Sequence, residues 1–342
     1  SNKRIKSALI SVYYKDQLED IVRKLHELEI KIYSTGGTFS FIKDLGIPAE
    51  TVERLTTYPS ILGGRVKTLH PSVFGGILSR RDNQEDALQL SKYGIPEIDL
   101  VIVDLYPFEE TVKKSDDEGE IIEKIDIGGI SLIRAGAKNF NDVLVVSSSS
   151  QYGALLDLLN EKNGTTSIDD RRYFAAMAFI TSSNYDTAIF KYFNRNAGIS
   201  VFRESINSSY PLRYGENPHQ KGVFFGDPEE VFDKLHGKEI SYNNFLDIDA
   251  ALGLIDEFDE TTFVIIKHNN ACGAASRRNP SDAWKDALAC DPVSAYGGVI
   301  ACNVPVTEAE ASEIDRIFFE IIIAPDYSEA ALKILMQKKN RI

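Results

Sequence analysis

The chain has 342 residues, of which 43% are hydrophobic and 26% charged, with a net charge of -13 and a pI near 5.0. This length accommodates two domains with buried cores. The acidic balance argues against general nucleic-acid binding, which needs a basic surface. No apolar run reaches membrane-spanning length, no signal pattern opens the chain, and three cysteines without metal-ligand spacing suit reduced thiols, so we expect a cytoplasmic location and no membrane partner.

Predicted strands and helices alternate in the first part of the chain. Apolar runs at 7–12, 30–33, 98–105 and 143–146 predict buried strands, and the amphipathic stretch 17–28 predicts a helix. This order predicts a parallel sheet with ligand loops at the carboxyl ends of its strands. We expect a solvated loop at 113–120 and a helix over 167–193. The polar stretch around 195–210 marks the expected boundary between domains 1–197 and 198–342.

Three glycine-rich loops in the first domain combine hydroxyl or basic residues with paired glycines. They occupy 63–71, running on to Gly75-Gly76, then 34–38, and 126–129 followed by Arg134 and Lys138. Glycine lets backbone N–H groups turn inward, so such loops suit an anion, especially before a helix. An ordinary surface turn or a helix cap would explain any one of them. Three together predict binding of a phosphate-bearing small molecule.

Other candidate groups also follow predicted strands. Lys267-His268 comes after the apolar run 263–266, and Tyr106 follows the run 98–105. A neighbouring ammonium favours the neutral imidazole that accepts a proton, although a structural histidine beside an exposed lysine would look the same. Tyr106 could equally be an aromatic rim of the core. A zinc deaminase site would need His-x-Glu and Cys-x-x-Cys, which this chain lacks, so we expect no metal.

Four ordered motifs carry a family resemblance. GGRVKTLHP (63–71), DIGG (126–129) with RAGAKN (134–139), LRYGENPHQ (212–220) and KHNNACG (267–273) resemble the bifunctional purine-biosynthesis family AICAR transformylase/IMP cyclohydrolase. The resemblance implies an α/β fold with a methylglyoxal-synthase-like parallel-sheet domain. A partial transformylase domain would follow, related to cytidine deaminase but without zinc. It also implies a homodimer.

The resemblance implies two reactions on nucleotide substrates. AICAR takes a formyl group from 10-formyltetrahydrofolate, its co-substrate, and formyl-AICAR then closes to IMP with loss of water. The implied catalytic residues are Lys67, Tyr106, Asp126, Lys138, Lys267 and His268. The implied substrate-binding residues are Ser11, Lys15, Ser34, Thr35, Gly36, Gly37, Arg65, Thr68, Gly128, Arg213, Tyr214 and Asn244. We expect 35–37, 65–68 and 138 to share one hollow.

The chain departs from the family pattern in its first loop and at its end. Tyr14-Lys15-Asp16-Gln17 replaces the usual Asp-Lys-Ser/Thr-Gly, and a carboxylate at Asp16 would repel a phosphate if it pointed inward. Family members continue well beyond Ile342, so we expect a truncated form or a shortened relative with an incomplete transformylase. Two alternatives stay open: an inactive nucleotide-binding or assembly module, and a methylglyoxal-synthase-like lyase, which would leave 212–298 unexplained.

Overall fold

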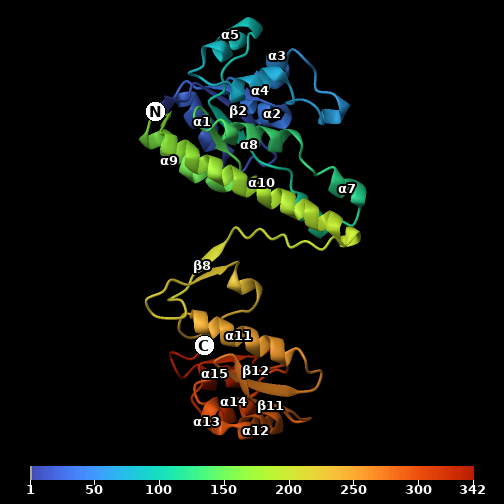
Figure 1. Ribbon diagram of the computed structural model, residues 1–342, viewed down its shortest axis with the longest axis vertical. Coiled ribbons are helices and arrows are strands. Elements are labelled where there is room, and N and C mark those ends of the chain that lie inside the picture. Colours follow the sequence, from blue (N-terminus) through green and yellow to red (C-terminus); the bar gives the residue numbers. More distant parts are fainter. Residues whose placement is uncertain (1) are drawn as a thin grey trace. The chain divides into compact units, whose positions relative to one another are not determined.

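The computed structural model describes residues 2–342, which form two compact units (Figure 1). The first unit ends at Ser205, and the second runs from Ile206 to Ile342. Each unit is built around a sheet of its own. We describe the two units separately.

The first unit contains a five-stranded parallel sheet in the order β4-β3-β2-β5-β6. Ala8 of the central strand lies opposite Ile32 on one side and Leu100 on the other. A short antiparallel pair, β1-β7, accompanies this sheet. The predicted parallel sheet is confirmed. The strands are β1 (Lys3–Arg4), β2 (Ser7–Ser11), β3 (Lys31–Ser34), β4 (Glu50–Thr51), β5 (Leu100–Val103), β6 (Leu144–Val146) and β7 (Thr165–Thr166).

Helices cover both faces of this sheet. Ala8 and Ile10 pack in one apolar cluster with α1 and α9, whereas Leu9 packs in a second cluster with α4 and α8. Burial on both faces explains why these strands are continuous apolar runs. The helices are α1 (Leu18–Glu27), α2 (Gly36–Asp44), α3 (Val52–Thr56), α4 (Pro71–Leu78), α5 (Gln84–Tyr93), α6 (Phe108–Lys114), α7 (Glu118–Ile122), α8 (Gly128–Lys138), α9 (Tyr152–Glu161) and α10 (Ile168–Ala197), with 3-10 turns η1 (Leu62–Gly64) and η2 (Ser149–Gln151).

Two segments differ from the sequence prediction. The stretch expected as a solvated loop at 113–120 contains the end of α6 and the start of α7, because Phe108 and Ile121 bury apolar side chains against Tyr185. Gly75 and Gly76, expected in a loop, lie inside α4. A Cβ at Gly76 would collide with the Pro96 carbonyl, so this glycine allows a close approach that offsets its low helix propensity.

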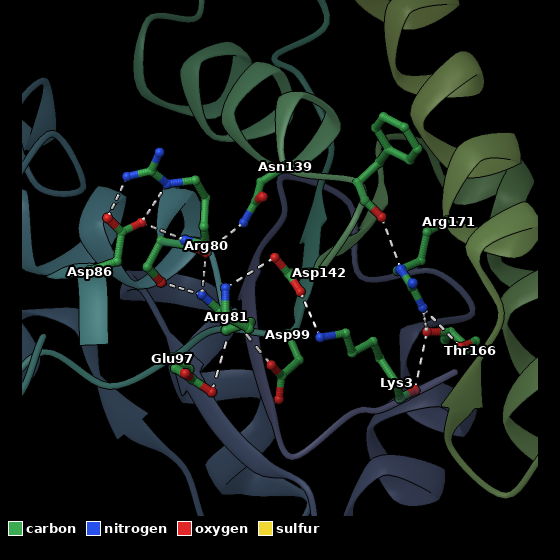
Figure 2. Close-up of polar contacts among 12 residues, drawn as sticks. Lys3, Arg80, Arg81, Asp86, Glu97, Asp99, Asn139, Asp142, Thr166 and Arg171 are labelled. Carbon is green, nitrogen blue, oxygen red and sulfur yellow. Dashed lines mark hydrogen bonds and ion pairs between the residues drawn. The ribbon is translucent and has the colours of Figure 1, made fainter. Parts of the chain in front are cut away.

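Polar contacts close the amino edge of the parallel sheet, around Arg81 (Figure 2). Its Nη2 donates to the Ile98 carbonyl at 3.0 Å, and its backbone N–H donates to Asp142 at 3.2 Å. Asp142 also pairs with Lys3 at 2.8 Å, and Asn139 donates to the Ile77 carbonyl at 2.8 Å. These contacts tie the ends of α4 and α8 to the starts of β5 and β6. The loops that follow β2, β3 and β5 leave the sheet at the opposite, carboxyl edge.

The second unit contains a mixed four-stranded sheet in the order β11-β10-β12-β13. Strand β10 is antiparallel to both neighbours, and β12 is parallel to β13. Phe263 packs against Trp284 on one face, while Val264 joins a cluster with α11 on the other. The elements are β8 (Ser209–Pro211), β9 (Val223–Phe225), β10 (Thr262–Lys267), β11 (Asn270–Ser276), β12 (Val299–Cys302), β13 (Ile321–Ile323), α11 (Tyr242–Ile255), α12 (Pro280–Cys290), α13 (Pro292–Ala295), α14 (Glu308–Ile314), α15 (Glu329–Leu335) and η3 (Pro228–Glu230).

Candidate active site

The ends of β2 and β3 bring two hydroxyl groups together. Ser11 Oγ and Thr35 Oγ1 are 2.7 Å apart. Thr35 is the N-cap residue of α2, but its side chain makes no capping hydrogen bond to that helix. A Cβ at Gly36 or Gly37 would meet open space within the described chain, so a ligand has room to reach the amide groups that begin α2. Ser34 is different, because its buried hydroxyl donates to the Ile10 carbonyl at 2.8 Å.

The loop after β2 places Lys15 at this same edge. Its ammonium donates to the carbonyls of Val12, at 2.5 Å, and Tyr13, at 2.9 Å. Burial lowers the pKa of Lys15 below its ordinary value, while the Asp104 carboxylate opposes this shift and the Lys67 ammonium adds to it. Lys67, far from Lys15 in sequence, is thus within electrostatic range of it. Positive charge from two segments of the chain favours an anion at this edge.

The loop before α4 contributes Thr68 and Arg65. It is a tight turn, with Gly63 and Gly64 at φ values of 66° and 93°. Thr68 is buried against the start of α8, where a Cβ at Gly128 would lie only 2.8 Å from the threonine Oγ1. The Arg65 guanidinium is exposed and forms an ion pair with Glu123.

The buried Asp126 and the half-buried Tyr106 are close enough for the Asp126 charge to act on the phenol. Asp126 Oδ1 accepts the Ile130 N–H at 3.0 Å, and the Asp126 N–H donates to the Tyr185 hydroxyl at 2.9 Å. Burial raises the pKa of Asp126, and the Asp104 carboxylate adds to the shift. Burial, then the charges of Asp126 and Asp104, raise the pKa of Tyr106. The phenol therefore keeps its proton, and the Asp126 carboxylate holds a proton more strongly than an exposed one would.

Lys138 does not join this group. It ends α8, whose first residue, Gly128, contacts Thr68. A helix rises about 1.5 Å per residue, so Lys138 lies on the order of 15 Å from that start. The next residue, Asn139, belongs to the polar contacts at the opposite edge of the sheet (Figure 2). The structure places Thr68 at the start of α8 and Lys138 at the end of that helix.

In the second unit, Lys267 and His268 lie at a hairpin rather than at the end of a parallel strand. Lys267 pairs with Asn270, and the two turn residues, His268 and Asn269, have φ values of 53° and 61°. Positive φ at both positions is the mark of a two-residue type I′ turn. The Asn269 N–H donates to Asp247 Oδ1 at 2.8 Å, and the Lys267 ammonium donates to the Tyr296 carbonyl.

Helix α11 links this hairpin to the loop that contains Arg213 and Tyr214. The Asn243 side chain donates to the Glu216 carbonyl of that loop at 3.1 Å, and Asp247, one turn further on, accepts from the hairpin. Residues four apart lie on one helix face, so the two segments meet beside the start of α11. The Arg213 guanidinium lies 5.6 Å from the Tyr214 ring centroid.

Asn244 forms a capping box with Ser241 at the start of α11. Its Oδ1 accepts the Ser241 N–H at 3.1 Å, and the Ser241 hydroxyl accepts the Asn244 N–H at 3.2 Å. The Asn244 amide also reaches Glu320 at 3.4 Å. This cap explains why α11 begins at Tyr242.

Sequence reasoning missed three residues that organise the first unit's site. Thr38 bonds both backbone groups of Val12, Asp104 accepts N–H groups of the loop after β2, and Tyr185 bonds the backbone of Asp126. Asp104 could have been found, because it is a charged residue near the end of the predicted strand 98–105. Thr38 ends the glycine-rich loop 34–38, although its bonds to Val12 could not be foreseen, and Tyr185 carries no pattern that separates it from ordinary helix residues.

Comparison with known families agrees with this arrangement. The model described as "AICARFT/IMPCHase bienzyme" matches residues 136–342, and the "MGS-like domain" model matches residues 17–131. The chain belongs to the AICARFT/IMPCHase bienzyme family. The predicted family is confirmed, as is the order of a methylglyoxal-synthase-like part followed by the transformylase region. Among the described residues, no helix is long and apolar enough to cross a membrane, and no group of three or more His, Cys, Asp or Glu could hold a metal.

Relatives in bacteria share this sequence over its whole length. The "Bifunctional purine biosynthesis protein PurH" of Bacteroides thetaiotaomicron is 62% identical over 341 residues, covering 100% of this chain and 67% of the relative. The protein of the same name from Persephonella marina is 44% identical, covering 98% of this chain and 68% of its own. A solved structure, "Crystal structure of ForH", is 34% identical with a TM-score of 0.49, covering 55% of this chain and 99% of its own. The chain thus spans about two thirds of the length of the two curated relatives.

Proposed function

We propose that the first unit closes formyl-AICAR nucleotide to IMP with loss of water. The observation that carries this proposal is the convergence of separate loops at one edge of the parallel sheet. That edge combines the Ser11–Thr35 hydroxyl pair, the Lys15 ammonium, whose pKa responds to the charge of Lys67, and the buried Asp126. Hydroxyl groups, cations and the start of a helix suit the phosphate of a nucleotide, with Ser34, Gly36, Gly37, Arg65, Thr68 and Gly128 as further proposed contacts.

Ring closure makes one carbon–nitrogen bond and then expels water. The carboxamide nitrogen attacks the formyl carbon, and negative charge develops on the formyl oxygen. The Lys67 ammonium and nearby N–H groups would stabilise that charge. Asp126, whose pKa burial raises, would accept the proton that the carboxamide nitrogen loses, and the protonated Tyr106 would donate to the developing alkoxide. Asp126 would then return its proton to this hydroxyl, which leaves as water, while the formamide nitrogen loses its own proton to the Tyr106 oxygen as the ring C=N bond forms. Lys138 has no part in this scheme.

The test supplies formyl-AICAR nucleotide and follows the absorbance of IMP. Wild-type protein should turn over, and Lys67→Met should lower kcat by about a hundredfold or more, as expected when charge stabilisation is removed. Lys43→Met, an exposed lysine of α2, should leave kcat unchanged. Absence of turnover in correctly folded wild-type protein would reject the proposal. Binding of IMP without turnover would instead indicate the inactive nucleotide-binding module.

We further propose that the second unit supplies the AICAR-binding part of the formyl transfer, with 10-formyltetrahydrofolate as co-substrate. His268 would take a proton from the AICAR amine, and Lys267 would stabilise charge on the departing folate nitrogen. Support comes from the positive φ of His268, an unusual conformation for a non-glycine residue. Arg213 and Tyr214 lie in the loop that α11 joins to this hairpin, where AICAR would bind. Asn244 caps the same helix start and is a further proposed contact.

A formyl-transfer assay with AICAR nucleotide and 10-formyltetrahydrofolate tests this second proposal. Asparagine also tolerates positive φ, so His268→Asn should keep the turn and lower formyl transfer by about a hundredfold or more. His26→Asn, on an exposed position of α1, is the control and should change nothing. Equal rates for the two variants would remove His268 from the mechanism.

We also propose a cytoplasmic homodimer, in which α10 contacts its counterpart. Tyr173, Ala176, Ile180, Ser183 and Thr187 follow a spacing of three and four residues along α10. Tyr173 is 56% exposed and Ile180 43% exposed, so this stripe leaves apolar surface uncovered. The three cysteines are free, which agrees with a reducing compartment.

Sedimentation equilibrium tests the dimer. Ile180→Glu should lower the mass from two chains to one, because the glutamate would lie in the interface. Leu88→Glu, at a more exposed apolar position on α5, should leave the mass unchanged. A wild-type monomer at micromolar concentration would refute the proposal.

A further inference from the structure

Two carboxylates flank β5 and hold the two ends of the neighbouring strand β2. Asp99, before β5, accepts the Lys6 N–H at 2.8 Å, just before β2 begins. Asp104, after β5, accepts the N–H of Tyr13 on Oδ1 and that of Tyr14 on Oδ2, the latter at 3.0 Å. The two strands are parallel and in register, so each carboxylate faces the equivalent end of β2. The chemistry is the same at both ends, but only Asp104 lies at the edge with the candidate site.

Asp104 uses both of its oxygens on the loop that leads to Lys15. Because each oxygen accepts one successive N–H group, the carboxylate fixes the backbone of Tyr13 and Tyr14 relative to β5. The Lys15 ammonium then folds back onto carbonyls of the same loop, those of Val12 and Tyr13. The loop shape therefore determines where this ammonium lies.

Asp104 also acts on Lys15 through charge. It attracts the Lys15 ammonium, whereas the nearby Lys67 ammonium repels it. Without the carboxylate, both burial and the second ammonium would favour the uncharged amine or displacement of the side chain. Asp104 thus offsets the cost of keeping the Lys15 ammonium charged in a partly buried place within range of a second cation.

We propose that Asp104 is a positioning residue, which holds Lys15 beside Lys67 so that both can bind the phosphate of the substrate. This inference rests on the nucleotide-binding function proposed above. It runs against simple electrostatics, because a carboxylate near a phosphate repels it. If repulsion dominated, removing Asp104 would tighten phosphate binding. If positioning dominates, as we propose, its removal weakens binding, so the sign of the change decides between the two.

The experiment measures KM for formyl-AICAR nucleotide and the Kd of IMP for the whole chain. Asp104→Asn keeps one acceptor and the size of the side chain, and Asp104→Ala removes both acceptors. We expect Asp104→Ala to raise KM and Kd by about tenfold, the effect of one lost charged hydrogen bond, and Asp104→Asn to raise them less. Asp99→Asn is the matched control, since it alters the other end of β2 and should leave KM and Kd unchanged. Tighter binding by either Asp104 variant, or equal effects at the two aspartates, would overturn the proposal.

A double-mutant cycle shows whether Asp104 acts through Lys15. The combination of Asp104→Ala with Lys15→Ala should bind IMP no more weakly than Lys15→Ala alone, because the lysine to be positioned is gone. Additive losses would refute this link. Hydrogen–deuterium exchange of the segment 12–17 gives a readout that needs no ligand. Faster exchange in Asp104→Ala, but not in Asp99→Asn, is expected even if wild-type protein lacks turnover, and unchanged exchange would contradict the positioning role.

Discussion

The contact between Thr68 and the start of α8 gives a direct test of how the site is assembled. In Gly128→Ala, the new Cβ would lie 2.8 Å from Thr68 Oγ1, whereas ordinary contacts begin at 3.4 Å. Thr68 is 3% exposed, so its side chain has little room to move aside. Overpacking of this kind costs about 1–3 kcal/mol. Replacing a helical glycine by alanine stabilises a helix by up to about 1 kcal/mol, so the free energy of unfolding should fall by a net amount on the order of 1 kcal/mol.

A second glycine supplies the matched control. A Cβ at Gly153, in the first turn of α9, would meet no described atom within 4 Å, so Gly153→Ala should gain about 0.5–1 kcal/mol. The two variants should then differ by about 2 kcal/mol, or roughly 4–8 °C in the melting temperature of a unit of this size. The double variant Gly128→Ala with Thr68→Ala removes the clashing oxygen and should recover stability, although substrate binding should stay weak.

The single tryptophan allows each unit to be followed separately. Trp284 is 1% exposed in the core of the second unit, so its fluorescence reports unfolding of that unit. Circular dichroism reports both units. Gly128→Ala should lower the melting temperature of the first unit, seen by circular dichroism. The melting temperature of the second unit, seen by fluorescence, should not change. A melting temperature equal to that of Gly153→Ala, with an unchanged KM, would refute the proposed close packing of Thr68 on α8.

Three further predictions concern charge and backbone conformation. The pKa of Lys15 is lowered, so this lysine loses its charge at a lower pH than usual; KM should rise as pH rises towards that pKa, and Lys15→Arg should abolish the rise in a pH series of initial rates. Arg81→Ala should destabilise the first unit by about 3–5 kcal/mol in urea melts followed by circular dichroism, because it leaves buried partners unpaired, whereas Arg80→Ala, on an exposed pair, should be neutral. His268→Gly should raise the free energy of unfolding of the second unit, followed by Trp284 fluorescence, by about 1 kcal/mol, because glycine adopts positive φ without strain. A lower free energy of unfolding would contradict the type I′ turn.

The first unit could be predicted from sequence because its signals are local. Apolar runs such as Leu100–Val103 end in polar residues, and in a parallel sheet all such ends meet at one edge. That rule places Ser11, Thr35 and Tyr106 together without knowledge of side-chain contacts. It does not place Lys138, whose position depends on where α8 begins. The loop glycine Gly128 is already helical, and the helix therefore carries Lys138 to the opposite edge.

The second unit was harder to predict, because its sequence patterns are compatible with more than one structure. The apolar run of β10 looks the same in a parallel or an antiparallel sheet, and its hairpin turn contains no glycine. His268 and Asn269 adopt positive φ only because Lys267 and Asn270 pair across the turn. Asn244 resembled a ligand-binding amide, yet the Ser241-x-x-Asn244 spacing is that of a capping box. The role of Asp104 depends on contacts between segments 90 residues apart, which no local pattern reveals.

The most direct test of the account is a crystal structure of the protein with IMP bound. The account predicts one nucleotide in the first unit, with its phosphate at the start of α2 between Lys15 and Lys67. The purine ring should lie beside Asp126 and Tyr106. A nucleotide bound at the Arg81 edge of the sheet, or a phosphate that contacts neither lysine, would contradict it.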